Sequence, residues 1–240
     1  MVYRQEIDTP SYLCDTNDRL HIWAAVRLCQ EVTEYHGNST GIGFKTLLAQ
    51  NRAWVISRAL YNFYRRPDAF ERIMLSTWAR GNDGLFAFRD YKVTGKEGEV
   101  LLTGTSYWPL IDINTRRVLR LGDVIDGYDI EDMEATDHKK LDKVSLPQMD
   151  DSDIVMQRTA VYSMLDHTQH VNNSEYIRLI FDCLDECGFD TDKPFTLELN
   201  YNHETKLGET LSVSLKQMPD AAYVQIRNPR GLSVSARVSQ

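Results

Sequence analysis

Residues 166–182 read DHTQHVNNSEYIRLIFD, and the second part of this stretch decides how the C-terminal half folds. Apolar side chains recur there with a helical period, at Tyr176, Ile177, Ile180, Phe181 and Leu184. The period predicts an amphipathic helix over residues 173–187. Asn172 is followed three residues later by Glu175, which is the spacing of a capping box, so we expect the helix to begin near Asn173.

The first part of the same stretch gathers polar side chains just before the helix, among them Asp166 and His170. A helix N-terminus stabilises developing negative charge, such as the oxyanion that forms when a carbonyl is attacked. A carboxylate and an imidazole beside it could act as nucleophile or general base. On the local pattern, the alternative stays open that Asp166 and Asn172 only cap turns and that His170 is an ordinary polar residue.

A second polar cluster, NYNHET at residues 200–205, lies inside a predicted strand over residues 195–205. Strand alternation places Asn202 and Glu204 on one face of that strand. A glutamate in a half-buried strand is either an edge-strand charge or the partner of a buried group. The pattern alone leaves both readings open.

The N-terminal half repeats this order of elements. A helical stripe runs over residues 20–36 and ends at Gly37. Strands are predicted at residues 52–64, 71–81, 85–95 and 99–112, and in the C-terminal half at residues 157–166, 195–205, 209–218, 222–228 and 232–238. Each half has one long apolar helix and no second helix to cover it. We therefore expect an α+β fold, made by tandem duplication, in which each helix lies across a strongly curved antiparallel sheet.

An acidic, turn-prone segment separates the two halves. It contains Pro147 and ends in an acidic run at residues 150–153. We interpret residues 125–153 as a linker between an N-terminal domain at 1–124 and a C-terminal domain at 154–240.

Composition narrows the class of protein. Hydrophobic residues make up 42% of the 240 residues and charged residues 26%, as in globular proteins with a real core. The net charge of -8 argues against nucleic acid as a partner, since phosphate binding needs a basic face. The sequence contains no run of about 18 apolar residues, so no membrane span is predicted. The four cysteines include no CxxC pair and the start has no apolar leader, so we expect reduced thiols in a cytoplasmic protein.

Four motifs together resemble the fatty acyl-ACP thioesterases of the bacterial type, a family of tandem hotdog domains. They are WVISR at 54–58, ERIMLSTWARGNDGLFAFRDY at 71–91, QHVNNSEYI at 169–177 and LNYNHET at 199–205. The resemblance extends from roughly residue 3 to 238. Both polar clusters fall inside it, which favours a catalytic role for them over simple capping.

The family's active site is an acid, an amide, a histidine and a downstream glutamate. The resemblance places the acid at Asp166, the histidine at His170 and the glutamate at Glu204. The amide position holds Thr168, so either its hydroxyl or a neighbouring amide such as Asn172 takes over the orienting role. A cysteine once proposed as the family's nucleophile is Thr205 here, so no thiolate mechanism is expected at that position.

The resemblance also implies where substrate binds. The thioester carbonyl would face the N–H groups after Asn172, so Asn172 and Asn173 are expected to bind substrate. The acyl chain would lie in the first domain, between the helix at 20–36 and the strand that carries Trp54. The aromatic candidates for this pocket are Trp23, Tyr35, Trp54 and Phe63. For each of them the alternative stays open that the side chain only packs in the hydrophobic core. No cofactor and no metal is implied.

The implied function is release of free fatty acid from acyl-acyl carrier protein, which ends chain elongation. An acyl-CoA thioesterase and a non-catalytic acyl-ACP-binding module stay open as alternatives, the latter because Thr168 replaces the amide. Acyl carrier protein is acidic, so its docking needs a basic patch. The candidates are Arg65 with Arg66, Arg116 and Arg117 with Arg120, and Lys139 with Lys140.

Two further expectations concern how many sites and chains there are. The position that matches His170 in the first half reads Asp18 or Arg19, so one active site per chain is expected. A homodimer is compatible with the resemblance.

Overall fold

The computed structural model describes residues 1–125, 128–137 and 140–240. The N-terminal half contains β1 (Tyr3–Asp8), α1 (Ile22–Ser39), α2 (Phe44–Leu48), β2 (Arg52–Trp54), β3 (Arg58–Phe63), β4 (Arg72–Asn82), β5 (Phe86–Thr94), β6 (Val100–Asp112), β7 (Val118–Leu119) and α3 (Gly122–Ile125). The C-terminal half contains β8 (Ile154–Thr159), α4 (Asn173–Glu186), β9 (Phe195–Tyr201), β10 (Thr210–Gln217), β11 (Ala222–Asn228) and β12 (Gly231–Ser239). Short 3-10 turns lie at Ser11–Leu13, Asp151–Asp153 and Tyr162–Met164. Each half therefore carries one long helix among its strands.

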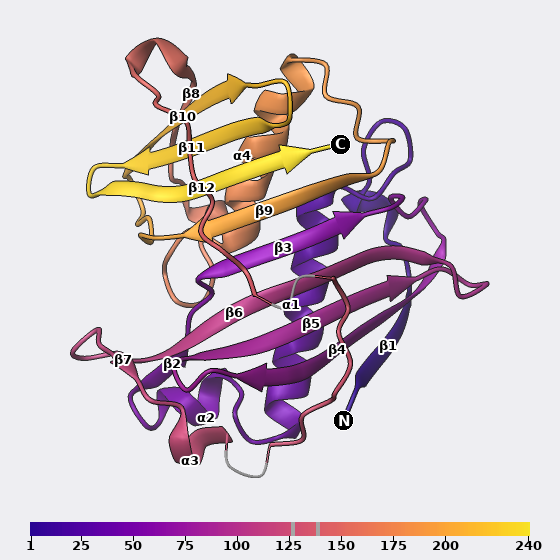
Figure 1. Ribbon diagram of the computed structural model, residues 1–240, viewed down its shortest axis with the longest axis vertical. Helices are drawn as coiled ribbons and strands as arrows, with labels where there is room; N and C mark the ends of the chain where they lie inside the picture. The colour runs from indigo at the N-terminus through magenta and orange to yellow at the C-terminus, as the bar shows by residue number, and fades with distance from the viewer. Residues whose placement is uncertain (126–127, 138–139) are drawn as a thin grey trace.

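The strands form one antiparallel sheet that runs through both halves (Figure 1). Their hydrogen-bonded order is β1-β4-β5-β6-β3-β9-β12-β11-β10-β8, and β2 and β7 pair with β6 beside this path. The halves join where β3 pairs with β9, and the stacked rings of Phe63 and Phe195 lie 4.8 Å apart at one end of that junction. The join places the end of β9 close to the N-terminal half.

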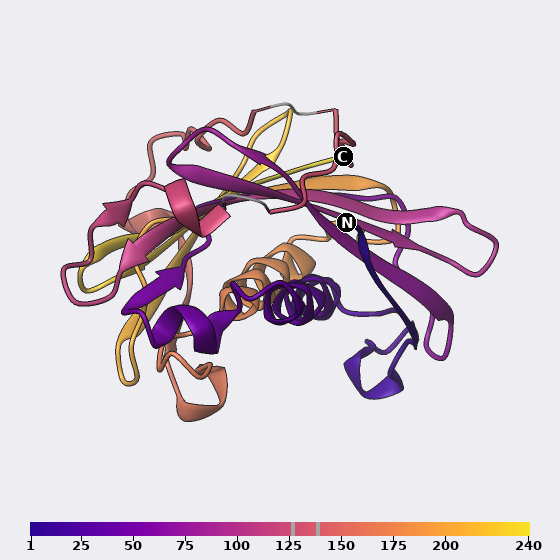
Figure 2. The same ribbon diagram turned by 90° about the horizontal axis from the view of Figure 1, so that it is seen from below.

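The two long helices cover the concave face of the sheet beneath its arch, and they meet near their N-terminal ends, where Arg27 contacts Glu175 (Figure 1 and Figure 2). Their buried apolar side chains include Ala24, Val26, Cys29 and Val32 of α1 and Tyr176, Ile177, Ile180, Cys183 and Leu184 of α4. Burying one large aliphatic side chain stabilises a fold by about 1.5–3 kcal/mol. The helical period read from the sequence therefore marks the surface that holds each helix on the sheet.

The segment between the halves crosses the opposite, convex face of the sheet (Figure 1). The Trp78 indole donates to the carbonyl of Met133 at 2.8 Å, and the N–H of Leu141 donates to the Tyr107 hydroxyl at 3.0 Å. The predicted linker thus lies against the sheet in the part that the structure describes.

Several predicted elements differ from the structure at their ends. The strand expected at 157–166 is wrong over most of its length, because β8 spans Ile154–Thr159 and the chain then forms the 3-10 turn at Tyr162–Met164. The helix expected at 20–36 spans Ile22–Ser39. The strand expected at 52–64 is interrupted at residues 55–57 and forms β2 and β3. The strand expected at 195–205 ends at Tyr201, because the chain turns away there to meet the loop before α4. Among the described residues, no helix has the length and apolar character that crossing a membrane requires.

Candidate active site

The loop before α4 brings Asp166 and His170 together. The N–H of Asp166 donates to the carbonyl of His170 at 2.9 Å, and the N–H of Gln169 donates back to the carbonyl of Asp166 at 3.0 Å. Gln169 closes this turn in a left-handed conformation with φ of 64°. Two residues separated in sequence by a tight turn therefore present their side chains to the same space.

Thr168 links the carboxylate to the imidazole. Its hydroxyl lies 2.5 Å from Asp166 Oδ1 and 3.3 Å from His170 Nδ1, and its N–H donates to the same Oδ1 at 2.8 Å. If the single hydroxyl proton is donated to Asp166, the oxygen is left to accept from Nδ1–H of His170. Thr168 can thus orient both groups, as predicted for the residue at the amide position. The second carboxylate oxygen of Asp166 accepts no hydrogen bond from the described residues.

Glu204 reaches the site from the turn after β9. Its Oε1 lies 3.4 Å from His170 Nε2 and 3.8 Å from Arg230 Nη1, and it accepts a hydrogen bond from Arg116 Nη2. Burial alone would raise the pKa of the Glu204 carboxyl. The hydrogen bond from Arg116 and the charges of His170 and Arg230 outweigh burial and lower the pKa below its usual value. Glu204 is therefore a carboxylate at neutral pH, and it lies beside the imidazole of His170.

The start of α4 offers a backbone donor beside these side chains. Asn172 caps the helix, with its Oδ1 accepting from the N–H of Ser174 at 2.9 Å and from the Ser174 hydroxyl at 2.7 Å. The N–H of Asn173 has no acceptor among the described residues. Asn172 is thus committed to capping, while Asn173 has a free donor at the positive end of the helix dipole.

The capping box predicted from Asn172 and Glu175 is wrong in its second half. The N–H of Asn172 donates to the carbonyl of Met164 at 2.9 Å. Glu175 is 3% exposed and pairs with Arg27 of α1 at 2.8 Å and with Arg178 at 3.4 Å. A buried carboxylate needs a cation more than it needs a neutral N–H, and Arg27 provides one from the neighbouring helix.

Two adjoining pockets open onto the catalytic side chains, with volumes of about 390 and 530 Å³. Volumes in this range suit small-molecule ligands. Both pockets are lined by Asp166, Thr168, His170, Asn173, Glu204 and Arg116, together with Trp54 and Trp108. Asn172 lines only the larger one. The catalytic side chains predicted from the sequence therefore share one cleft between the two halves.

An apolar slot continues from the same two tryptophans into the N-terminal half. It lies between α1 and strands β4 and β5, and its apolar lining includes Ile42, Ala79, Ala87, Phe88, Ile125 and Ile130. Trp54, predicted to bind substrate, lies where the slot meets the cleft. The cavity of this slot is about 60 Å³, so in this structure it is a narrow apolar opening beside the polar cleft.

The other aromatic candidates lie away from this slot. Trp23 lies between the guanidinium groups of Arg27 and Arg178, which are 5.3 and 4.1 Å from its ring centre. Tyr35 is 45% exposed, and Phe63 is buried in the sheet junction. Phe63 thus has the core role that the sequence left open, and Trp108 is the slot aromatic that sequence reasoning missed.

Cysteine chemistry has no place in this cleft. None of the four cysteines, all of which the structure describes, lines either pocket. Burial raises the pKa of the Cys29 thiol to about 12, and burial with neighbouring carboxylates raises that of Cys183 to about 12. Thr205 is fully buried and its hydroxyl accepts from Tyr176 at 2.9 Å, so this side chain supports the site from below.

The basic residues predicted to dock acyl carrier protein differ in their exposure and in their ion pairs. Arg65 pairs with Glu71 at 2.7 Å, and Arg66 is 5% exposed and pairs with Asp15. Arg117 and Arg120 are exposed and follow in sequence Arg116, which lines the cleft. Lys140 is exposed elsewhere, and Lys139 lies outside the described residues.

Comparison with protein families gives two matches that together cover most of the chain. The model described as Acyl-ACP thioesterase N-terminal domain matches residues 1–128, and the one described as Acyl-ACP thioesterase C-terminal domain matches residues 148–230. Among curated relatives, oleoyl-acyl carrier protein thioesterase 2 of Arabidopsis thaliana is 23% identical across 98% of this chain and 68% of its own length. A dodecanoyl-[acyl-carrier-protein] hydrolase of Umbellularia californica is 29% identical across 85% of this chain and 56% of its own length.

Solved structures agree on the fold. An acyl-ACP thioesterase from Bacteroides thetaiotaomicron superimposes with a TM-score of 0.82, at 23% identity, over 99% of this chain and 97% of that one. The 12:0-ACP thioesterase from Umbellularia californica gives a TM-score of 0.84, also at 23% identity, over 99% and 96%. The expected α+β fold of two tandem hotdog domains is confirmed.

Proposed function

This chain belongs to the acyl-ACP thioesterase family, and we propose that it hydrolyses the thioester of acyl-acyl carrier protein and releases free fatty acid, ending chain elongation. One observation carries the proposal. Asp166, His170 and Glu204 meet in a cleft that leads past Trp54 into an apolar slot. The chain spans only 56% of the length of the dodecanoyl-ACP hydrolase it matches, so the activity is argued from this cleft as well as from the relatives.

We assign the two halves different tasks, with residues 1–124 holding the acyl chain, 125–153 connecting, and 154–240 supplying the catalytic side chains. The thioester carbonyl oxygen would lie against the free N–H of Asn173, where the helix dipole stabilises an oxyanion. The slot is apolar, so burying the acyl chain there is favourable by about 0.8 kcal/mol per methylene. Binding energy from the chain would thereby hold the carbonyl at the catalytic loop.

Two chemical routes fit the geometry. In the first, Asp166 takes a proton from water, the water oxygen bonds to the carbonyl carbon, the C–S bond breaks, and the carrier thiolate takes up the proton. In the second, Asp166 Oδ2 bonds to the carbon and the C–S bond breaks, releasing the carrier thiolate. Water then hydrolyses the acid anhydride, which restores the Asp166 carboxylate, releases the fatty acid and supplies the proton that the thiolate takes up. Incorporation of oxygen-18 into Asp166 during a single turnover in labelled water would support the second route. In both, His170 orients the carboxylate or polarises the carbonyl.

The test of the proposal is release of free fatty acid from acyl-acyl carrier protein by the purified protein. Asp166→Asn, His170→Ala and Glu204→Ala should each lower turnover by about 10² or more, as expected for positioned acid–base groups. A variant that keeps near-full turnover removes that residue from the site. Gas chromatography of the fatty acids released would give the preferred chain length.

The partner we propose is acyl carrier protein, docking at Arg117 and Arg120, which follow Arg116 in sequence. Because the carrier is acidic, Arg120→Glu should raise KM for the carrier substrate, and more so at low salt. An equal effect on a small pantetheine thioester would rule out this docking surface.

An acyl-CoA thioesterase is the nearest alternative, and kcat/KM for matched acyl-ACP and acyl-CoA distinguishes the two. Retention of acyl-ACP without release of fatty acid would instead favour a non-catalytic binding module. We propose the cytoplasm as the site of the reaction, as predicted from the sequence. The homodimer stays a prediction that light scattering of the purified protein tests.

A further inference from the structure

The Glu204 carboxylate is held by an arginine from the other half of the chain. Arg116 lies in the turn between β6 and β7, and its Nη2 donates to Glu204 Oε1. The two residues are 88 positions apart in sequence. Both line the two pockets that contain Asp166 and His170. The contact therefore lies at the cleft, at the point where the N-terminal half meets the catalytic loop.

The turn around Arg116 is built to aim that side chain. Asp112 Oδ1 accepts from the N–H and hydroxyl of Thr115 at 2.7 and 2.9 Å, and the N–H of Arg116 donates to the Asp112 carbonyl at 2.8 Å. Arg116 itself has φ of 59°. A residue other than glycine is uncommon in this left-handed region and is held there only when its surroundings fix it.

Three side chains face Glu204, namely the guanidinium groups of Arg116 and Arg230 and the imidazole of His170, and Arg116 differs from the other two. Arg230, in the turn between β11 and β12, also pairs with Glu209 at 3.0 Å and donates to the carbonyl of Glu204. His170 belongs to the reacting group of side chains. Within the described residues, Arg116 forms no ion pair except the one with Glu204. Its charge is thus directed at this carboxylate alone.

We propose that Arg116 is a positioning residue for the hydrolysis: its guanidinium fixes the Glu204 carboxylate beside His170, so that the N-terminal half completes the site of the C-terminal half. This inference rests on the proposed thioester hydrolysis. The competing account is an ordinary surface ion pair, since the Arg116 side chain is 52% exposed and exposed pairs contribute little. The two accounts differ in what happens to Glu204 when the arginine is removed.

The experiment compares Arg116→Gln with Arg72→Gln. Arg72 is 56% exposed and pairs with Asp8 at 2.9 Å on the far edge of the sheet, so it is a matched exposed ion pair away from the cleft. Turnover and KM are measured from pH 4 to 9 with acyl-acyl carrier protein and with a small acyl-pantetheine thioester. The small substrate separates positioning from carrier docking.

Arg116→Gln should lower kcat by roughly tenfold on both substrates, because a charge-assisted hydrogen bond to Glu204 is lost. The pKa of Glu204 should rise without Arg116, so the acid limb of the kcat/KM profile should move to higher pH. Arg116→Lys should recover part of that shift. Arg72→Gln should leave kcat and the pH profile unchanged.

A double-mutant cycle guards against indirect effects. In a Glu204→Gln background, Arg116→Gln should change kcat by less than about twofold, because its target carboxylate is gone. The inference is overturned if Arg116→Gln keeps the wild-type kcat and acid limb, or if it raises only KM for the carrier substrate, which would make Arg116 a docking residue. If the wild-type protein hydrolyses neither thioester, the proposed function itself fails.

Discussion

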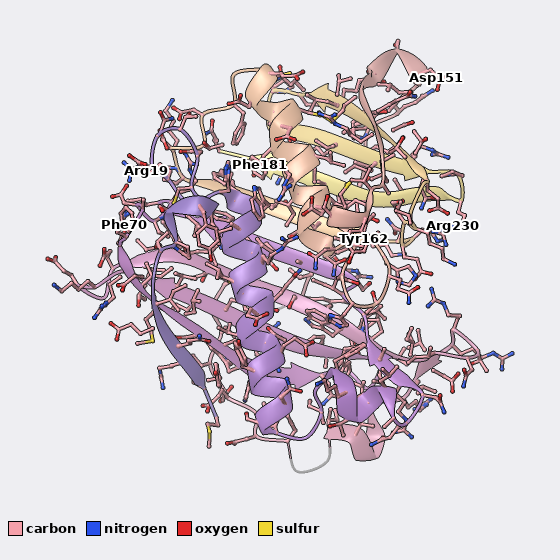
Figure 3. The ribbon with its side chains drawn as sticks, turned by 180° about the vertical axis from the view of Figure 1, so that it is seen from behind. Arg19, Phe70, Asp151, Tyr162, Phe181 and Arg230 are labelled. Atoms are coloured by element: carbon pink, nitrogen blue, oxygen red, sulfur yellow. The ribbon has the colours of Figure 1, made fainter. Side chains whose placement is uncertain are left out.

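The loops before α1 and before α4 have the same backbone and opposite chemistry. In the first, the N–H of Asp15 donates to the carbonyl of Arg19 at 2.8 Å. In the second, the N–H of Asp166 donates to the carbonyl of His170 at 2.9 Å. The residue before each acceptor is left-handed, with φ of 59° and 64°. Figure 3 shows the two regions on opposite sides of the molecule, with Arg19 and Phe70 at one and Tyr162 and Arg230 at the other.

Each loop contacts a neighbouring turn through the same backbone hydrogen bond, but the two turns carry side chains of opposite charge. The carbonyl of Pro67 accepts from the first loop as that of Thr205 accepts from the second, at 2.8 and 2.9 Å. The residues that precede these two are therefore equivalent, and they are Arg66 and Glu204. One internal repeat has an arginine where the other has the glutamate that we propose to be catalytic.

Two exchanges therefore distinguish the loops, because Arg19 stands where the second loop has His170 and Arg66 where it has Glu204. Arg66 lies 2.5 Å from Asp15 Oδ2 and is nearly buried, and it also pairs with Asp192 at 2.9 Å. Asp166 forms no ion pair within the described residues and lines the cleft. The same backbone arrangement thus holds the proposed catalytic site in one half and the ion pair of Asp15 with Arg66 in the other. The expectation of one site per chain remains a prediction, which the following variants test.

The largest effect is expected when Glu204 is given the charge of its counterpart. Glu204→Arg should lower turnover by about 10³, because it removes the carboxylate and places a cation beside His170 and Arg116. Steady-state release of fatty acid measures this effect. Turnover within tenfold of wild type would show that the charge at this position does not separate the two loops.

The next effect concerns stability and should fall on the other loop. Asp15→Asn should lower the free energy of unfolding by about 2 kcal/mol, because Arg66 loses one of its two carboxylate partners in a nearly buried place. Asp166→Asn, with no ion pair to lose, should change it by less than about 0.5 kcal/mol. Urea unfolding followed by circular dichroism measures both values. Equal losses in the two variants would contradict the structural role of Asp15.

Thr168 and its counterpart Asn17 sharpen the comparison further. Each donates its N–H to the aspartate of its own loop at 2.8 Å. Thr168→Ala should lower turnover about tenfold, since it removes the bridge between Asp166 and the imidazole. Thr168→Asn, which copies the amide of the first loop, should stay within about threefold of wild type. An active alanine variant would remove the hydroxyl from the mechanism.

The smallest effect is a pH dependence of stability. Burial acts to raise the pKa of Asp15, but the hydrogen bonds from Arg66 and from backbone N–H groups lower it below its usual value. A lowered pKa contributes stability that is present above the unfolded pKa of about 3.9 and is lost as pH falls through the folded pKa. As pH falls from about 5 to 3, the free energy of unfolding should therefore decrease less in Asp15→Asn than in wild type. If the free energy of unfolding depends on pH equally in the two proteins over that range, Asp15 does not have the lowered pKa that the structure indicates.

Local signals predicted the framework well. The helical period and Asn172 fixed the start of α4 to the residue, because both depend on side chains close in sequence. The placement of Asp166 and His170 in one turn before that helix was equally local, and their catalytic role stays a prediction. The order of elements repeated in the two halves predicted the sheet with one helix in each half. Element ends were less certain, since the break between β2 and β3 and the end of β9 depend on what the chain packs against.

Long-range partners could not be read from the sequence. Glu175 has the spacing of a capping residue, and only Arg27, 148 positions away, redirects it. Arg116 stood in an arginine pair that looked like a docking surface, and its partner Glu204 is 88 positions away. The charge reversal between Arg66 and Glu204 becomes visible only once both turns are placed beside their loops.

The account is tested most directly by the turnover of acyl-acyl carrier protein by Asp166→Asn and Asp15→Asn, measured side by side on folded protein. We predict that Asp166→Asn loses about 10² or more in kcat, as for removal of a positioned acid–base group, and that Asp15→Asn stays within about twofold of wild type. Near-full turnover by Asp166→Asn, or an equal loss in both variants, would contradict the assignment of catalysis to the loop before α4.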